Sequence, residues 1–128
     1  MKRTILTAMA AAATSVTMAP AAAQTSAGDA AHGRTLYQAQ CAACHSVVAG
    51  KSLVGPSLKG VVGRVAGKSA GFAYSPAMSK AGFKWDKARL DAYITAPAKT
   101  VPGNRMPYGG MPDSAQRRDL LAYLASNK

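Results

Sequence analysis

Apolar residues recur at helical spacing early in the chain, at residues 30–40. Ala30, Gly33, Leu36 and Tyr37 fall on one side of a helix drawn over this stretch, and most of its polar side chains fall elsewhere. A pattern of this kind predicts a helix that buries one face against another part of the protein.

Three later stretches each open with a side chain that can accept a hydrogen bond from a free helical N–H group. These stretches are residues 76 to about 82 after Ser75, residues 87 to about 96 after Asp86, and a last helix to about residue 126 after Asp113 or Ser114. We expect Pro97 to end the second of them, because the residue before a proline is disfavoured in a helix.

Glycine and proline interrupt the chain between these helices. They are spread over residues 46–72 and again over residues 101–112, and loops of this length in a small domain usually wrap something or carry function. No stretch alternates between apolar and polar residues as a strand does, and no segment is repeated. The sequence therefore predicts an all-α domain with three to five short helices, two long loops and few bulky residues for a core of its own.

The beginning of the chain has the layout of a secretory signal peptide: a basic start, an apolar run and a small-residue cleavage site. The apolar run covers residues 5–18, and we expect cleavage after Ala23. Because the run is short and interrupted by Thr and Ser, a signal peptide at residues 1–23 is favoured over an uncleaved membrane anchor. Residues 24–128 are then one domain, exported to the periplasm and without stable membrane insertion.

The chain is strongly basic, with 16 Lys and Arg against 5 acidic residues and a net charge of +11. The basic residues are scattered and no stacking aromatic residues lie between them, so nucleic acid is not the expected partner. A basic surface on an exported protein indicates docking onto acidic surfaces of partner proteins.

Two cysteines lie three residues apart, and a histidine follows the second: Cys41, Cys44 and His45. This is the covalent attachment signature of c-type haem. At this spacing both thiols lie on one face of a helical turn, so both can reach the vinyl groups of one porphyrin. The imidazole that follows can bind the iron as its proximal ligand.

Other uses of a cysteine pair fit the sequence less well. The chain has no further cysteine, so a zinc site would have to recruit His45 and His32. A thioredoxin-like pair follows a strand and precedes a helix, whereas here a predicted helix precedes the motif and a glycine-rich loop follows it. A plain disulfide remains compatible with an exported protein.

One imidazole ligand leaves the opposite position on the iron to be filled. Met106 lies between prolines in a loop without helical period, where a methionine is poorly explained as core filling, and a thioether ligand raises the reduction potential of the iron. Met111 stands at the approach to the last helix, Met78 within a short helix, and His32 at the exposed end of the first helix. Met106 is therefore the predicted sixth ligand, with Met111 as its rival.

From about Gly28 to Leu124 the chain resembles the class I c-type cytochromes of the soluble mitochondrial and bacterial type. Beside the attachment motif, the resemblance is carried by Gly28–Gly33 with Tyr37, Gly55–Leu58, Gly60–Arg64, Gly71–Ser75, Trp85, Tyr93, Pro97, Pro102–Met106 and Arg118–Leu124. It implies the cytochrome c fold around one covalent haem c, whose iron lies between His45 and Met106.

The resemblance also implies roles for five further residues. In the family, a proline carbonyl accepts a hydrogen bond from the proximal histidine, which points to Pro56. Side chains next to a haem propionate point to Arg64, Tyr74 and Trp85, and a buried tyrosine near the ligand sulfur points to Tyr93. Taken alone, the aromatic residues also fit an ordinary core.

The function that follows is one-electron transfer, with no catalysis on a bound substrate. The expected partners are redox proteins with acidic docking surfaces, and the expected state is a monomer. Two alternatives stay open: a haem enzyme or sensor with an open sixth position, and a haem subunit of a larger periplasmic dehydrogenase or oxidase.

Overall fold

The computed structural model describes residues 27–128, so the predicted signal peptide at residues 1–23 lies outside them. Their helices are α1 (Ala30–Gln40), α2 (Pro76–Ser79), α3 (Lys87–Thr95), α4 (Pro97–Thr100) and α5 (Ser114–Ser126). Over this part of the chain the only strand-like pairing is an isolated antiparallel bridge between Val65 and Lys84. The prediction of an all-α fold is confirmed.

Side-chain caps start four of these helices, three of them at the positions predicted from the sequence and the fourth at Asp29. The carboxylates of Asp29, Asp86 and Asp113 accept hydrogen bonds from the first free N–H groups of α1, α3 and α5. The Ser75 hydroxyl does the same for α2, which has Pro76 at its first position. Each cap satisfies a main-chain donor that the helix itself leaves free.

Pro97 ends α3 as predicted and also has a second role. It does end α3, since Ala96 before it is extended with φ −153° and ψ 83°, but it also opens α4. Proline is well suited to the first helical position because its fixed φ is helical. Its missing N–H is no loss there, since an N–H in the first turn has no acceptor within the helix. The segment between α3 and the second loop, for which the sequence predicted no element, is thus a short helix.

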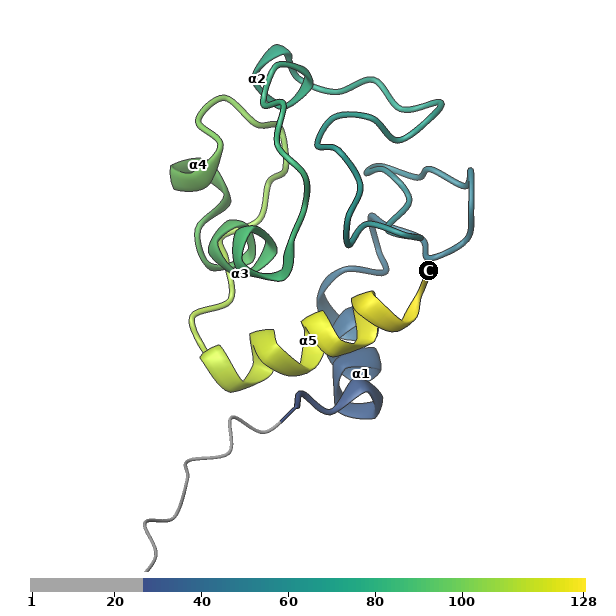
Figure 1. Cartoon of the computed structure of the whole chain (residues 1–128), viewed down its shortest axis with the longest axis vertical. Helices are drawn as coiled ribbons and strands as arrows, with labels where there is room; N and C mark the ends of the chain where they lie inside the picture. Colours follow the sequence, from purple (N-terminus) through teal and green to yellow (C-terminus); the bar gives the residue numbers. More distant parts are fainter. Residues whose placement is uncertain (1–26) are drawn as a thin grey trace, which may run out of the picture.

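The first and last helices cross closely, as Figure 1 shows for α1 and α5. The contact depends on Gly33: a Cβ atom at this position would lie 2.0 Å from the main-chain oxygen of Asp119. On either side of the crossing, Leu36 of α1 and Leu120 of α5 are buried, and the rings of Tyr37 and Tyr123 pack 5.4 Å apart. A residue without a side chain therefore sets the distance between the two helices.

The loop 46–72 forms the wall opposite α2, α3 and α4 in Figure 1. Main-chain hydrogen bonds join it to the segment before α3: Gly63 N donates to Trp85 O, Trp85 N to Arg64 O, and Ala66 N to Phe83 O, at 2.7–2.8 Å. These bonds hold Trp85 and Arg64 next to each other on the inner side of the fold. Over residues 27–128, no helix is both long and apolar enough to cross a membrane.

Candidate functional site

The helices and the two loops enclose a cavity of about 490 Å³, a size typical of small-molecule and cofactor sites. Its lining is mainly apolar and includes Leu58, Val61, Leu90, Leu120 and Leu124. All the predicted site residues line this one cavity, namely Cys41, Cys44, His45, Pro56, Arg64, Tyr74, Trp85, Tyr93 and Met106. Residues that are up to 65 positions apart by their numbers thus converge on a single space.

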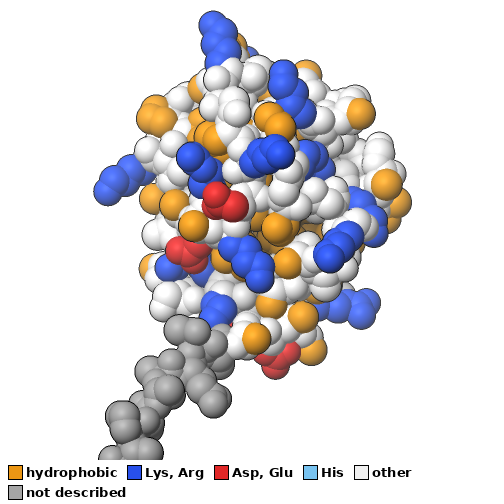
Figure 2. Space-filling view, viewed as in Figure 1, with side chains coloured by type: hydrophobic (Ala, Val, Ile, Leu, Met, Phe, Trp, Pro, Cys, Tyr) orange, Lys and Arg blue, Asp and Glu red, His pale blue; other side chains and the backbone are white. Residues whose placement is uncertain are grey.

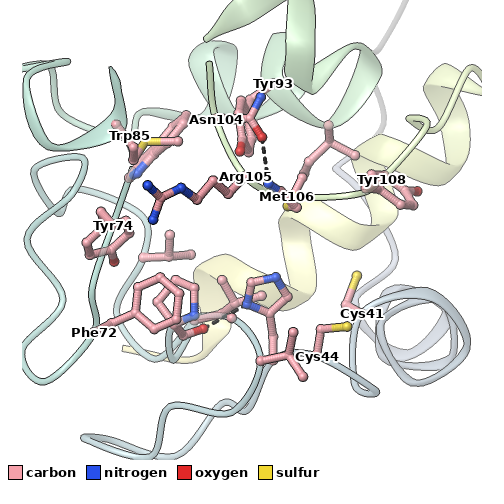
Figure 3. Close-up of a pocket in the computed structure, with 18 of the residues that line it drawn as sticks. Cys41, Cys44, Phe72, Tyr74, Trp85, Tyr93, Asn104, Arg105, Met106 and Tyr108 are labelled. Carbon is pink, nitrogen blue, oxygen red and sulfur yellow. Dashed lines mark hydrogen bonds between the residues drawn. The ribbon is translucent and has the colours of Figure 1, made fainter. Parts of the chain in front are cut away.

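Cys41 and Cys44 lie on the turn that follows α1. The carbonyl of Cys41 accepts hydrogen bonds from Cys44 N at 3.0 Å and His45 N at 2.9 Å, and Figure 3 shows both sulfurs at one edge of the cavity. Burial, together with the Cys44 thiol, raises the pKa of Cys41 to about 11. A redox-active dithiol needs a lowered thiol pKa, so these surroundings do not favour a thioredoxin-like pair.

The imidazole of His45 is held through one of its two nitrogens. Nδ1 lies 2.8 Å from the carbonyl oxygen of Pro56, and because a carbonyl only accepts, Nδ1 is the nitrogen that carries the proton. Nε2 therefore keeps its lone pair, which is the arrangement of a metal-binding histidine with its outer partner. Burial lowers the pKa of His45, although the bond to Pro56 opposes the shift, and the neutral ring is the form that binds a metal.

Gly55 packs directly against this ring. A Cβ atom at residue 55 would lie 2.4 Å from Cε1, 2.7 Å from Nδ1 and 2.9 Å from Nε2 of His45. In addition, the Tyr37 hydroxyl donates a 2.6 Å hydrogen bond to the main-chain carbonyl of His45. The ring and its main chain are thus fixed from several directions.

Met106 lies on the opposite side of the cavity from Cys44 in Figure 3. The side chain of Asn104 sets the local main chain: its Oδ1 accepts from Met106 N at 2.8 Å, and its Nδ2 donates to Val101 O at 2.9 Å. The loop therefore presents Met106 on a short, internally bonded turn.

The other candidate sixth ligands are placed differently. Met111 is only 1 % exposed and belongs to the packed core outside the cavity lining. His32 is not among the residues that line the cavity; it is half-exposed, and its Nδ1 lies 2.8 Å from a carboxylate oxygen of Asp119. Met78 does line the cavity, from α2, so among the loop methionines Met106 alone faces it.

Tyr74, Trp85 and the guanidinium of Arg105 lie at the end of the cavity away from the cysteines (Figure 3), and Arg64 also lines the cavity. The guanidinium of Arg64 donates to the carbonyls of Lys59 at 3.0 Å and Ser57 at 2.8 Å, and the hydroxyl of Tyr74 accepts a 3.3 Å bond from Ser69 N. The Arg64 head group is thereby fixed on the cavity wall as a positive charge.

Trp85 and Tyr93 pack against each other in the cavity wall, with ring centroids 5.0 Å apart. Both are buried, and burial raises the pKa of Tyr93 to about 12, so its hydroxyl keeps its proton at neutral pH. Two hydrogen-bond donors on rigid aromatic frames are thus available in the cavity wall.

The deciding comparison is with protein families, because the family model "Cytochrome c" matches residues 30–128. The chain belongs to the cytochrome c family. It is 48% identical to cytochrome c2 of Rhodoblastus acidophilus over 103 residues, covering 80% of this chain and 95% of that protein. It is 43% identical to cytochrome c of Tetrahymena pyriformis over 99 residues, covering 77% of this chain and 89% of that protein.

A solved structure agrees with this assignment. Cytochrome cH from Methylobacterium extorquens superposes with a TM-score of 0.72 at 43% sequence identity, covering 77% of this chain and 99% of that one. Cytochromes c carry electrons on one covalently bound haem c and are not enzymes. The expected resemblance to class I c-type cytochromes, the expected cofactor and the expected absence of enzymatic activity are therefore confirmed.

The cavity suits haem c on its own chemistry. Two thiols lie at one edge for the thioether bonds, an imidazole offers a free Nε2, and the wall between them is apolar. In contrast, no group of three His, Cys, Asp or Glu side chains within residues 27–128 is placed to hold a bare metal ion. The zinc alternative therefore has no site in the described part of the chain.

The sequence did not predict the ion pair between Arg117 and Asp91, which lies where the second loop meets α5. Arg117 is only 8 % exposed; its Nε donates to Asp91 at 2.7 Å, and one terminal nitrogen donates to the carbonyls of Met111 and Pro112, both at 2.8 Å. A signal was available in the sequence: Arg117 lies on the inward face of the last predicted helix, and an arginine is rarely buried without a partner of opposite charge.

Proposed function

We propose that this cytochrome c is a soluble periplasmic electron carrier whose haem iron is bound by Nε2 of His45 and the thioether of Met106. The observation that carries the proposal is that both side chains line the same cavity while Nδ1 of the imidazole is bound to Pro56. When bound, the haem supplies an iron that cycles between the ferrous and ferric states.

The protein's part is to keep both ligands in place in either oxidation state. The imidazole is held by Pro56 and confined by Gly55, and the Met106 main chain is held by Asn104. Because neither ligand has to move, the surroundings rearrange little when one electron arrives or leaves. A sulfur ligand in an apolar cavity favours ferrous iron and a positive potential.

The attachment and propionate contacts complete the site. Cys41 and Cys44 form the thioethers. Arg64, Tyr74 and Trp85 would bind the haem propionates by hydrogen bonds and, for Arg64, by charge. The charge of Arg64 and the donors of the two aromatic residues match carboxylates. Tyr93 packs near the Met106 side.

Partner proteins are proposed to bind through acidic surfaces. All five acidic residues are already engaged: Asp29, Asp86 and Asp113 cap helices, Asp91 pairs with Arg117, and Asp119 is bonded to the imidazole of α1. Lys and Arg side chains are spread over the face in Figure 2 with few acidic ones between them. The rate of electron transfer to an acidic partner should therefore fall as ionic strength rises, and a rate independent of salt would remove this part of the proposal.

Export is the remaining element of the proposal. Removal of residues 1–23 by signal peptidase would leave a monomeric protein that starts at Gln24. The intact mass of the protein purified from a periplasmic extract tests this directly, since cleavage after Ala23 and addition of one haem give one defined mass. A mass that retains residues 1–23 would mean an anchored form.

The iron ligands are tested by spectroscopy of the purified protein. A pyridine haemochrome assay should report thioether-bound haem, and the ferric protein should show the near-infrared charge-transfer band of a methionine ligand. The band should be lost in Met106→Ala and retained in Met111→Ala, the matched control from the same loop. A high-spin spectrum in the unaltered protein would instead indicate an open sixth position, as in a haem enzyme or gas sensor.

A further inference from the structure

Hydrogen bonds hold the two ends of the loop that carries Met106. At its start, Val101 N donates to the carbonyl of Pro97 in α4 at 3.0 Å, and the Asn104 side chain joins the main chain of Val101 to that of Met106. At its end, Met111 N donates to the carbonyl of Ile94 at 2.9 Å, and Arg117 donates to the Met111 carbonyl at 2.8 Å. The start of the loop is thus held to α4 and its end to α3 and α5, and these bonds leave the middle of the loop to be fixed by something else.

The middle of the loop reaches the other side of the cavity through one side-chain hydrogen bond. The hydroxyl of Tyr108 donates to Oε1 of Gln40 at 2.6 Å, and among residues 27–128 no other side-chain hydrogen bond joins residues 101–112 to α1. Gln40 is the last residue of α1, directly before Cys41. The bond therefore links the ligand loop to the haem attachment turn.

This hydrogen bond lies at the rim of the cavity. Tyr108 and Gln40 both line it, Gln40 is exposed, and Figure 3 shows Tyr108 beyond Met106 on the side where Cys41 lies. Pro107 precedes the tyrosine and two glycines follow it, so the neighbouring residues offer no side-chain bond of their own. Among the hydrogen bonds that hold the loop, this exposed one is the easiest to break, so opening of the loop is expected to begin here.

We propose that the Tyr108–Gln40 hydrogen bond is a tether that keeps the Met106 loop closed over the haem and limits how often Met106 leaves the iron. The inference rests on the ligation by Met106 proposed above. Both partners are positioning residues, because they act on the ligand through the loop. An external ligand binds the iron only when Met106 is off, so its apparent affinity is proportional to the fraction of open molecules.

The test is titration of the ferric holoprotein with imidazole. Tyr108→Phe removes the hydroxyl alone, and Gln40→Met removes the acceptor at nearly constant size. Loss of one hydrogen bond should raise the open fraction by about 2- to 10-fold, so the apparent dissociation constant for imidazole should fall by the same factor. Gln38→Met is the matched control, since it makes the same replacement on the exposed part of the same helix, and it should leave the constant unchanged.

The double variant Tyr108→Phe, Gln40→Met separates a shared bond from two independent effects. If the tether exists, the double variant binds imidazole no more tightly than either single variant. Additive effects, or single variants that match Gln38→Met, would overturn the tether while the methionine band of the unaltered protein still upheld the iron ligation. Absence of that band from the unaltered protein would overturn the ligation itself, and the tether with it. Thermal unfolding of each variant shows that the fold is retained.

Discussion

The replacement Gly55→Ala tests how tightly the fold holds the proximal imidazole. The backbone at residue 55 is outside the left-handed region, so alanine suits the local conformation and on that ground alone would stabilise the protein by about 0.4–1 kcal/mol. The added Cβ, however, would lie 2.4 Å from Cε1 of His45. The ring would have to retreat by roughly 1 Å to regain ordinary van der Waals separation.

The ring has little room to make this movement. Overpacking of a well-filled site costs about 1–3 kcal/mol. Moving Nδ1 away from Pro56, now at 2.8 Å, forfeits a hydrogen bond worth about 0.5–1.5 kcal/mol. After the gain from the unfolded state is subtracted, Gly55→Ala should lower the free energy of unfolding by about 0.5–4 kcal/mol.

The assay is denaturant unfolding of the ferric holoprotein, together with its visible and near-infrared spectrum. Gly109→Ala is the control, because its Cβ would meet no atom within 4 Å and its backbone is also outside the left-handed region. The control should be as stable as the unaltered protein or slightly more stable. If Gly55→Ala matched Gly109→Ala in stability and in spectrum, the imidazole would not be confined as described.

Three further outcomes follow from contacts between the helices. Gly33→Ala should lower the free energy of unfolding by about 1–3 kcal/mol, because the added Cβ would collide with the main chain of Asp119. This loss is expected although alanine favours a helix over glycine by about 1 kcal/mol. An unchanged denaturant midpoint would contradict the close crossing of α1 and α5. Arg117→Met should lower the free energy of unfolding by about 1–3 kcal/mol, because Asp91 and two carbonyls lose their hydrogen-bond donor. Asp91→Asn should lower it by less, because the bonds from Arg117 to the two carbonyls remain. Equal losses in the two variants would show that only the charge pair matters. Hydrogen bonds from an imidazole and a main-chain N–H hold the pKa of Asp119 below its usual range. This group therefore stabilises the fold above about pH 4 and ceases to do so as the pH falls through its folded-state pKa; Asp119→Asn should flatten the stability profile in that acid range, and an unaltered profile would contradict this assignment.

Local chemistry in the sequence was enough to locate most of the helices. Asp29, Ser75, Asp86 and Asp113 cap helices where an acceptor side chain precedes a helical pattern. The rule that a helix ends before proline predicts the end of α3 at Pro97, but it says nothing of α4, which the same proline begins. Signals of this kind locate the end of one helix without saying whether a loop or another helix comes next.

The site was predictable as a set of residues and much less so as a set of contacts. The attachment motif and family spacing brought out the lining residues, while the bond between Arg117 and Asp91 spans 26 residues and that between Tyr108 and Gln40 spans 68. Pairs so far apart are decided by how the helices pack, and no spacing rule along the chain encodes them. The sequence predicted His32 as a surface residue, and it is half-exposed. Its hydrogen bond to Asp119, from α1 to α5, is a third contact that depends on how the helices pack.

Crystallography of the holoprotein with anomalous data at the iron absorption edge tests the central claim most directly. The account predicts one iron peak per molecule in the cavity, with Nε2 of His45 and the sulfur of Met106 as its axial neighbours and density continuous from the haem to both cysteine sulfurs. A peak whose axial sulfur belongs to Met78 or Met111, or an iron with an open sixth position, would contradict it.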